Sequence, residues 1–446
     1  MSWDDGGVSA GLNGLSAVET AGRIRSGEIS SSELVRACLD RIEEREPVVR
    51  AWEFLDPELA LAQARRCDTS EPRGPLHGVP VGLKDQFDTA DMPTGYGSPI
   101  YEGYRPVADA EAVARLRAAG AIVLGKNKLT EFATFHPTDT TNPLDPNRTP
   151  GGSSSGSAAA VADHMVPVAT GTQTIGSIIR PASYCGIFGY KPTFGSIPRA
   201  GVLPLCASLD HVGLFARTVE DLELFAKAIT RTDPSQPAIR TAQPLDLDLR
   251  GPDELDRPRI AFVRTLQWPE LDASPRDRLE ETAARLDEHG ADVEEVTLPE
   301  KFGSLVEVQN TIFETELARA LSYEYENHPD QLSDLLYDII EQGNSVEMDE
   351  YLEAQKLAAE CRWESGELFR GHDVLLAPSV RGEPPEGLES TGDPLFLRMW
   401  TLLGLPCVSL PGIRGPNGLP LGAQIIGPMY KDGLALSIAG WAARQL

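Results

Sequence analysis

Two segments rich in glycine and serine carry residue types that could do nucleophilic chemistry. The first is Gly151-Gly-Ser-Ser-Ser-Gly-Ser157, and the second runs from Gly171 to Arg180 and contains Ser177. Runs of this composition are usually flexible linkers, but these two flank an apolar stretch at 158–168. Consecutive backbone N–H groups in a tight loop can bind an anion, and a serine at the end of such a loop lies beside an oxyanion hole. The phosphate-loop and nucleophile-elbow patterns are both absent. A serine beside an anion-binding loop instead makes nucleophilic attack by a serine the chemistry to consider.

A serine nucleophile needs a base to activate its hydroxyl, and no histidine lies in either segment. Lys84 is the alternative, because it ends a run, Val79-Pro-Val-Gly-Leu-Lys84, that has the pattern of a short buried strand. A buried lysine is rare unless it is used or paired. The competing interpretation is a surface turn formed by Lys84 and Asp85.

Together these residues resemble the amidase signature family of serine hydrolases, over nearly the whole chain. Four motifs carry the resemblance in order: Gly74–Asp85, Pro150–Ala160, Gly171–Arg180 and Cys185–Thr193. The nearest members are stand-alone amidases whose motif has the form GTQT-x-G-S-x-I-R-P-A. Two departures from the usual family pattern accompany this: Gln173 replaces an aspartate, and Ile179 stands where an arginine is usual, with Arg180 one place later.

The resemblance implies a Ser–cisSer–Lys triad made of Lys84, Ser153 and Ser177. Ser177 would be the nucleophile, Ser153, after a cis peptide bond, the bridging serine, and Lys84 the base. The oxyanion would be held by the backbone N–H groups of Thr174, Ile175, Gly176 and Ser177. Lys84 must be neutral to act, so we expect burial to lower its pKa and Asp85 not to pair with it. Ile175 replaces a glycine, and we expect it to supply its N–H while narrowing the acyl pocket.

The expected function is hydrolysis of the C–N bond of a small carboxylic amide through an acyl-enzyme, with no metal or organic cofactor. Three alternatives stay open: a hydrolase of carbamoyl or urea-type amides, the glutamine-hydrolysing A subunit of a tRNA-dependent amidotransferase, and a non-catalytic scaffold. The segment 391–403 resembles the free-standing amidases more than the amidotransferase component. Many relatives are homodimers, which leaves a homodimer open for this chain.

Composition excludes other classes of partner. The 446 residues include 67 Asp and Glu against 40 Lys and Arg, giving a formal net charge of −27. Such a chain repels phosphate backbones and anionic headgroups, so we expect no nucleic-acid or membrane partner. We find no apolar run of the ~18 residues that a membrane span requires, and no signal-peptide pattern at the N-terminus. The six cysteines form no CxxC pair and predict reduced core thiols in a cytoplasmic protein.

Helices and strands alternate along the chain and must position these residues. Capping boxes at Ser16 and Ser30 predict two N-terminal helices, and Asp109 and Thr218 are expected to cap two more. Strands are expected at 79–84, 121–125, 260–263, 292–297, 374–377 and 407–410. The alternation favours one α/β domain over residues 1–446, with a surface excursion at about 231–258. The resemblance implies a large, mixed, twisted β-sheet covered by helices on both faces.

Overall fold

The computed structural model of the chain describes residues 11–230, 245–251 and 254–446. Most of the surface excursion expected at 231–258 therefore lies outside the described residues. Within them, one 11-stranded sheet has the order β1-β3-β2-β4-β6-β5-β10-β11-β9-β7-β8. Its strands are β1 (Trp52–Leu55), β2 (Pro80–Lys84), β3 (Ile122–Asn127), β4 (Val168–Gln173), β5 (Phe188–Lys191), β6 (His211–Ala216), β7 (Arg259–Arg264), β8 (Asp292–Thr297), β9 (Val374–Pro378), β10 (Cys407–Leu410) and β11 (Ala423–Ile426).

The sheet is mixed, as the resemblance implies. β2 lies parallel to both β3 and β4, and β7 lies parallel to both β8 and β9. The pairings through the middle, from β4 across to β9, are antiparallel. The fold class is therefore α/β with a large mixed sheet, and the expected strands all form. β1, β4, β5, β6 and β11 are additional to those that the sequence predicts.

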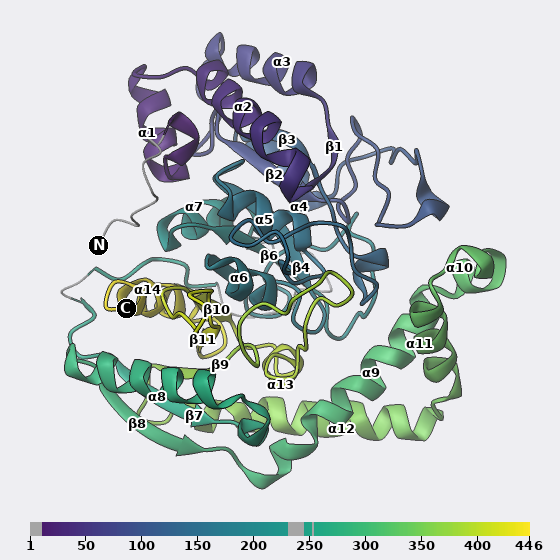
Figure 1. Cartoon of the computed structure of the whole chain (residues 1–446), viewed down its shortest axis with the longest axis vertical. Coiled ribbons are helices and arrows are strands. Elements are labelled where there is room, and N and C mark those ends of the chain that lie inside the picture. Colours follow the sequence, from purple (N-terminus) through teal and green to yellow (C-terminus); the bar gives the residue numbers. More distant parts are fainter. Residues whose placement is uncertain (1–10, 231–244, 252–253) are drawn as a thin grey trace.

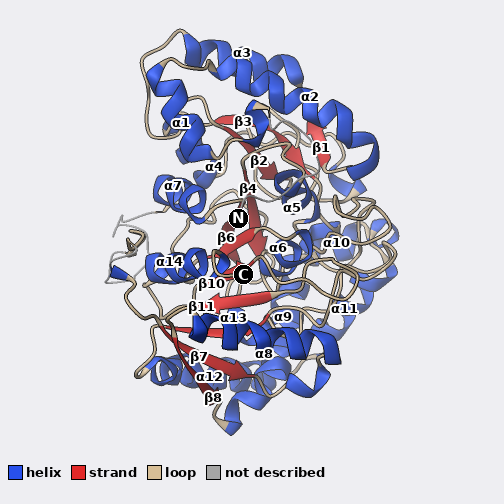
Figure 2. Ribbon diagram, turned by 60° about the vertical axis from the view of Figure 1, so that its left-hand side comes forward, coloured by secondary structure: helices blue, strands red, loops and turns tan. Residues whose placement is uncertain are grey.

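Helices cover both faces of this sheet (Figure 2). They are α1 (Ala17–Ser26), α2 (Ser31–Val49), α3 (Pro57–Asp68), α4 (Glu111–Ala118), α5 (Ser155–Ala162), α6 (Ile179–Cys185), α7 (Val219–Ile229), α8 (Ala273–Glu288), α9 (Leu305–Ala320), α10 (Ser322–Asn327), α11 (Asp334–Ser345), α12 (Met348–Glu364), α13 (Arg398–Leu402) and α14 (Asp432–Ala443). Figure 1 shows α9, α11 and α12 packed together beside the lower half of the sheet.

Alternation along the strands divides the core in two. Ala261 and Val263 of β7 belong to one apolar cluster, which also contains residues of α2, α5, α6 and α9. Ile260 and Phe262 belong to the other, with residues of α4, α7, α8 and α14. Successive side chains of a strand point to opposite faces, so both faces of the sheet are buried under helices. The aromatic side chains of Trp400 and Tyr96 are buried in the first cluster.

Local capping agrees with the sequence in most places. Ser16 and Ser30 both form full capping boxes, and the Thr218 side chain accepts from the Asp221 N–H at the start of α7. The predicted cap at Asp109 is wrong. Helix α4 starts two residues later without a side-chain cap, because the Asp109 carboxylate accepts from the Ala90 N–H and pairs with Arg117 instead.

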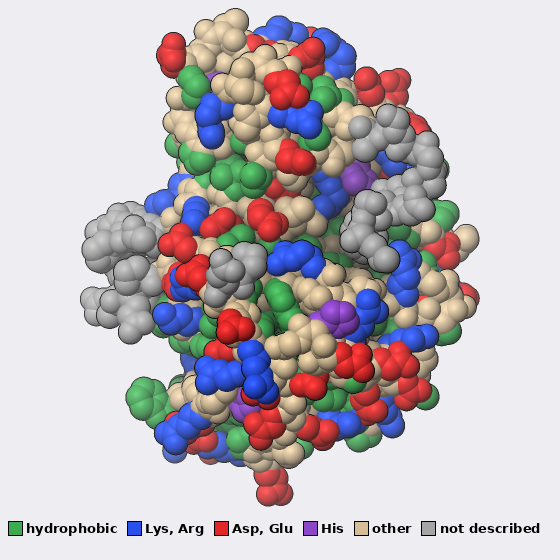
Figure 3. Space-filling model, turned by 90° about the vertical axis from the view of Figure 1, so that its left-hand side faces the viewer, with side chains coloured by type: hydrophobic (Ala, Val, Ile, Leu, Met, Phe, Trp, Pro, Cys, Tyr) green, Lys and Arg blue, Asp and Glu red, His purple; other side chains and the backbone are tan. Residues whose placement is uncertain are grey.

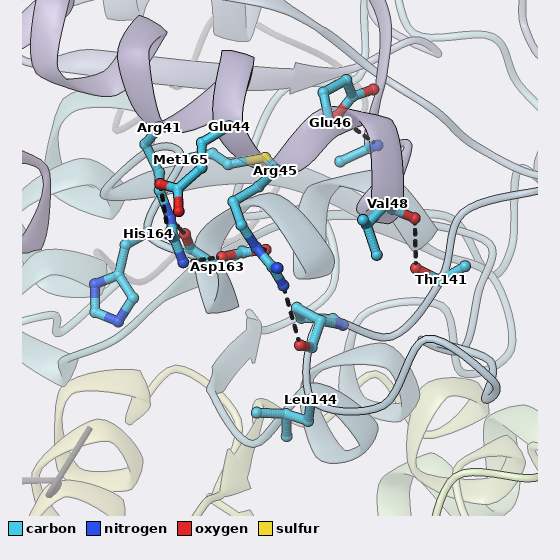
Figure 4. A network of polar contacts seen from close by, with 12 residues as sticks. Arg41, Glu44, Arg45, Glu46, Val48, Thr141, Leu144, Asp163, His164 and Met165 are labelled. Carbon is cyan, nitrogen blue, oxygen red and sulfur yellow. Dashed lines mark hydrogen bonds and ion pairs between the residues drawn. The ribbon is translucent and has the colours of Figure 1, made fainter. Parts of the chain in front are cut away.

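A polar network ties α2 to the far end of α5 (Figure 4). Asp163, the residue after α5, forms ion pairs with both Arg41 and Arg45 of α2. The Arg41 Nε also donates to the Asp163 carbonyl oxygen at 2.9 Å. Asp163 is almost fully buried, so two arginines compensate one buried carboxylate. These contacts fix the direction of α5, whose first turn follows the serine-rich loop.

The surface seen in Figure 3 shows acidic and basic side chains interspersed, without a continuous basic area on that face. None of the described helices is both long and apolar enough to cross a lipid bilayer. The six cysteines are all unpaired, and five of them are buried.

Candidate active site

Lys84 lies at the end of β2 and is completely buried. Its Nζ lies 2.8 Å from the Ser153 Oγ and 2.6 Å from the Thr172 Oγ1. The peptide bond between Gly152 and Ser153 is cis, as the resemblance implies. The structure therefore brings together the predicted lysine and the predicted bridging serine, which are 69 residues apart in the chain.

Burial, the larger effect, lowers the pKa of Lys84 well below its usual value, and the charge of Asp210 acts in the opposite direction. Asp85, the neighbouring carboxylate, does not contact Lys84. It forms a fully buried ion pair with Lys126 at 2.8 Å and accepts from the Gly95 N–H at 2.7 Å. Because its nearest polar neighbours are two hydroxyls, Lys84 can hold its amine neutral and accept a proton from one of them.

The serine-rich loop is fixed between β3 and β4. The Thr130 N–H donates to the Ser153 carbonyl oxygen at 3.2 Å, and the Gly156 N–H donates to the Lys128 carbonyl oxygen at 3.0 Å. On the other side, the Ser154 hydroxyl lies within 3.5 Å of both the N–H and the carbonyl oxygen of Thr172. The loop thus sits against the two strands that border β2 and presents Ser153 to the end of that strand.

Ser177 lies in the turn between β4 and α6 and is 8% exposed. Its hydroxyl makes no hydrogen bond within the described part of the chain, so the structure does not join it directly to Ser153. The backbone N–H groups of Thr174, Ile175, Gly176 and Ser177 also have no acceptor among the described residues. Four successive unpaired N–H groups around a serine are the feature that an oxyanion hole requires.

The carbonyl groups of the same turn are held from behind. The Gln309 Nε2 of α9 donates to the Thr174 carbonyl oxygen at 3.3 Å, and the Thr401 Oγ1 of α13 donates to the Ile175 carbonyl oxygen at 2.7 Å. The C=O and the N–H of a trans peptide unit point in opposite directions. Holding these two oxygens therefore turns the N–H groups of Ile175 and Gly176 away from α9 and α13.

Gln173 explains one departure from the family pattern. Its Oε1 accepts from the N–H groups of Ile178 and Ile179 at 2.8 and 3.0 Å, so it caps the start of α6. Its Nε2 donates to the Thr401 Oγ1 at 2.8 Å. An aspartate could accept the first two bonds but has no N–H for the third. Gln173 therefore links the end of β4 to both α6 and α13.

Arg180 explains the second departure. It is almost fully buried, and its guanidinium donates to the carbonyl oxygens of Gly152 and Gly392 at 2.7 and 2.9 Å. A third bond joins it to the Thr391 Oγ1 at 3.0 Å. No carboxylate pairs with it among the described residues, and burial lowers its pKa to about 10. The arginine thus connects the turn that contains Ser177, the loop that contains Ser153 and the 391–392 segment.

Ile175 fits its position without backbone strain. It is not among the residues with positive φ, so the glycine-like conformation that would disfavour a β-branched residue does not occur here. Its side chain is 5% exposed and belongs to the apolar cluster shared with α5, α6 and α9. Its N–H is therefore available to a ligand in the turn.

Five supporting residues of the site were not predicted from the sequence: Gln86, Thr172, Asp210, Gln309 and Thr401. Gln86 directly follows the Gly74–Asp85 motif, and Thr172 lies within the Gly171–Arg180 motif. Asp210, Gln309 and Thr401 reach the site from segments far along the chain. Helix α9 reaches the site through Gln309, which donates to the Thr174 carbonyl oxygen. No group of histidine, cysteine, aspartate and glutamate suited to a metal ion is present in the described ranges.

The comparisons with known proteins establish the family of the chain. The amidase family matches residues 33–436, so the chain belongs to the amidase signature family, whose members hydrolyse amides. The A subunit of the glutamyl-tRNA(Gln) amidotransferase of Picosynechococcus sp. is 33% identical over 95% of this chain and 97% of its own length.

Two solved structures show how closely the fold is shared. A structure described as an inhibitor-bound vestigial protein complex, related to the origins of an s-triazine catabolic enzyme, has a TM-score of 0.87. It is 30% identical and covers 96% of this chain and 98% of its own. The peptide amidase of Stenotrophomonas maltophilia has a TM-score of 0.82 at 30% identity, covering 96% of each chain.

Proposed function

We propose that this amidase hydrolyses a small carboxylic amide through an acyl-enzyme on Ser177, with Ser153 as the bridging serine and Lys84 as the base. The observation that carries the proposal is the 2.8 Å contact between the Lys84 Nζ and the Ser153 Oγ in a fully buried setting. A buried lysine bonded to hydroxyls, with Asp85 held by Lys126, has the neutral amine that a general base needs.

The proposed reaction starts with proton transfer along the three side chains. The Ser177 hydroxyl gives its proton to Ser153, while the Ser153 proton moves to the Lys84 amine, which becomes an ammonium. The Ser177 oxygen attacks the amide carbonyl, and the oxyanion is received by the N–H groups of Thr174, Ile175, Gly176 and Ser177.

Proton transfers in the opposite direction then complete the reaction. The proton held on Lys84 returns through Ser153 to the amide nitrogen, so the C–N bond breaks and ammonia or an amine leaves. Water then attacks the acyl-enzyme, giving one proton to the relay and releasing the carboxylic acid and the free Ser177 hydroxyl. No step calls for a metal or an organic cofactor.

A second candidate is the glutamine-hydrolysing component of a tRNA-dependent amidotransferase, favoured by the full-length similarity to the A subunits of such enzymes. The stand-alone assignment is supported by the segment 391–403, which resembles the free-standing amidases more than the amidotransferase component. We also propose that the chain acts as one amidase domain, since one sheet runs from β1 to β8. The unpaired cysteines suit the reducing cytoplasm.

The test is release of ammonia or amine by the purified chain from a panel of small acyl amides, glutamine, a urea and a carbamate. We expect turnover of an acyl amide without any added partner chain, and its loss in Lys84→Ala. If glutamine were the only substrate turned over, and if a co-purifying partner chain raised its turnover, the amidotransferase component would be favoured. Wild-type turnover by Lys84→Ala would remove the base assignment, and no turnover or serine labelling at all would favour the scaffold.

A further inference from the structure

Lys84 contacts two hydroxyl groups, so the direction of each hydrogen bond decides whether its amine can act as a base. A neutral amine has two N–H groups and one lone pair. The hydroxyls of Ser153 and Thr172 can each donate or accept. If the Thr172 hydroxyl donated to the Lys84 lone pair, the amine could not accept a proton from Ser153. The base therefore works only if the lone pair faces Ser153.

The surroundings of Thr172 fix the direction of its hydroxyl. The Thr172 Oγ1 lies 2.7 Å from the Gln86 Oε1, and a carbonyl oxygen of an amide can only accept. The threonine must therefore give its single hydroxyl hydrogen to Gln86. Its oxygen is then left as an acceptor for an N–H of Lys84.

The orientation of the Gln86 amide is fixed in turn by the backbone. The side-chain Nε2 of Gln86 donates to the main-chain carbonyl oxygen of Leu203 at 2.8 Å. The Leu203 N–H donates back to the main-chain carbonyl oxygen of Gln86 at 3.2 Å. A flipped amide would set two carbonyl oxygens against each other, so this arrangement has one stable sense. Gln86, Thr172 and Lys84 are all buried, which protects the chain of bonds from bulk water.

We propose that Gln86 is a positioning residue that sets the direction of the hydrogen bonds at Lys84, so that the amine lone pair faces Ser153. The hydrogen bonds are donated in one direction, from Lys84 to Thr172, from Thr172 to Gln86 and from Gln86 to the Leu203 carbonyl oxygen. Thr172 keeps its proton throughout, and the transferred protons move only between Ser177, Ser153 and Lys84. This inference rests on the proposed function, because it concerns the base of that reaction.

The absence of charge on glutamine distinguishes it from glutamate at this position. Gln86 offers an acceptor without a negative charge, so it does not favour the ammonium form of Lys84. The charged group that acts on Lys84 is Asp210, which lines a cavity of about 180 Å³ together with Gln86, Thr172 and Arg199. His211 lines the same cavity and is kept neutral, since burial holds its pKa well below the usual value. The cavity leaves room for substitutions at position 86.

Two variants distinguish a role of Gln86 in setting the hydrogen-bond direction at Lys84 from a role in anchoring the loop. Gln86→Met and Gln86→Glu both lose the donor to Leu203, but only the methionine also loses the acceptor for Thr172. We expect Gln86→Met to lower kcat by about 10- to 100-fold with KM changed less than about three-fold. This loss is smaller than the roughly 100- to 10,000-fold that general-base catalysis contributes as a whole, because the base itself remains. We expect Gln86→Glu to keep most of the kcat at high pH, with the acid limb moved to higher pH because its charge favours the ammonium.

The experiment measures kcat, KM and their pH profiles on the best amide of the panel, with melting temperatures for every variant. Gln63→Met is the matched control, because Gln63 is a buried glutamine that bonds to the Val123 carbonyl oxygen in the packing of α3 on β3. Equal losses in Gln86→Met and Gln86→Glu at all pH values would overturn the inference in favour of loop anchoring. Wild-type rates in Gln86→Met would also overturn it. Inactive Lys84→Ala with unaffected Gln86→Met would refute the inference alone, whereas active Lys84→Ala would refute the proposed function.

Discussion

The guanidinium of Arg180 donates a hydrogen bond to the carbonyl oxygen of Gly152, at 2.7 Å. Arg180 lies three residues after the proposed nucleophile, and Gly152 directly precedes the proposed bridging serine. This contact joins the two serine segments that the sequence shows only as separate motifs. It also gives a physical reason for an arginine at position 180 in a chain that lacks the usual arginine at 179.

Replacing Arg180 should therefore affect both stability and activity. Arg180→Met leaves the oxygens of Gly152, Gly392 and Thr391 without their buried donor. We expect the free energy of unfolding to fall by about 2–4 kcal/mol, since each buried unsatisfied group costs roughly 1–3 kcal/mol. Arg180→Lys should restore little, because one ammonium cannot match the fork of the guanidinium. Denaturant unfolding measures the stability of each variant, and kcat measures its activity. A loss of less than about 0.5 kcal/mol in the free energy of unfolding of Arg180→Met would contradict the expectation.

Thr401 should matter for rate more than for binding. Thr401→Val loses the donor to the Ile175 carbonyl oxygen and the acceptor for Gln173. The N–H of Gly176 is then less well oriented, and we expect kcat to fall about 10- to 100-fold, less than the loss of a whole oxyanion donor. KM should stay nearly constant, and Thr401→Ser should recover most of the rate. Equal activity of the valine and serine variants would show that the bond is dispensable.

The acid limb of the pH profile should move when Asp210 is neutralised. The negative charge of Asp210 favours the ammonium form of Lys84 and so raises its pKa against the effect of burial. Asp210→Asn removes that charge, lowers the pKa of Lys84 and should shift the acid limb of kcat/KM to lower pH. Asparagine can still accept from the N–H groups of Leu205 and Cys206.

Asp163→Asn is the matched control for this shift. Asp163 is also a buried carboxylate, but it pairs with Arg41 and Arg45 at the far end of α5. The acid limb of this variant should coincide with that of the wild type. A shift of Asp210→Asn to higher pH would contradict the assigned sign of the interaction.

The buried pair of Asp85 and Lys126 is expected to be structural. Lys126→Met leaves the Asp85 carboxylate buried without its partner, which should destabilise the protein by about 3–5 kcal/mol. Adding Asp85→Asn should recover part of this loss, because the neutral amide needs no counter-charge. Thermal and denaturant unfolding of the two variants check the pair. Full stability of Lys126→Met would mean that Asp85 has another partner, and the neutrality of Lys84 would then need a different explanation.

Much of the framework could be predicted from local sequence. The capping boxes at Ser16 and Ser30 and the buried strand ending at Lys84 depend on neighbouring residues, and all form as expected. β4 could not be predicted because Thr170-Gly-Thr-Gln173 has the composition of a loop, although its pairing with β2 and β6 makes it a strand. Asp109 failed as a cap because the Ala90 N–H, from outside the helix, and Arg117, within it, both bind its carboxylate.

The supporting residues of the site could not be predicted in the same way. Gln309 and Thr401 reach the nucleophile turn from α9 and α13, more than 130 residues farther along the chain. A buried glutamine or threonine has no pattern that separates it from ordinary packing residues. Lys84, Ser153 and Ser177 could be identified because their motifs resemble a family, whereas their orientation depends on contacts made only in the fold.

The most direct test of the proposed mechanism is the reaction of the purified protein with a small fluorophosphonate probe, followed by peptide mass spectrometry. We predict one adduct, on Ser177, absent in Ser177→Ala and strongly slowed in Lys84→Ala. Ser153→Ala should also slow labelling, with a smaller effect than Lys84→Ala. An adduct on another serine, or undiminished labelling of Ser177 in Lys84→Ala, would contradict the central claim that Lys84 activates Ser177 through Ser153.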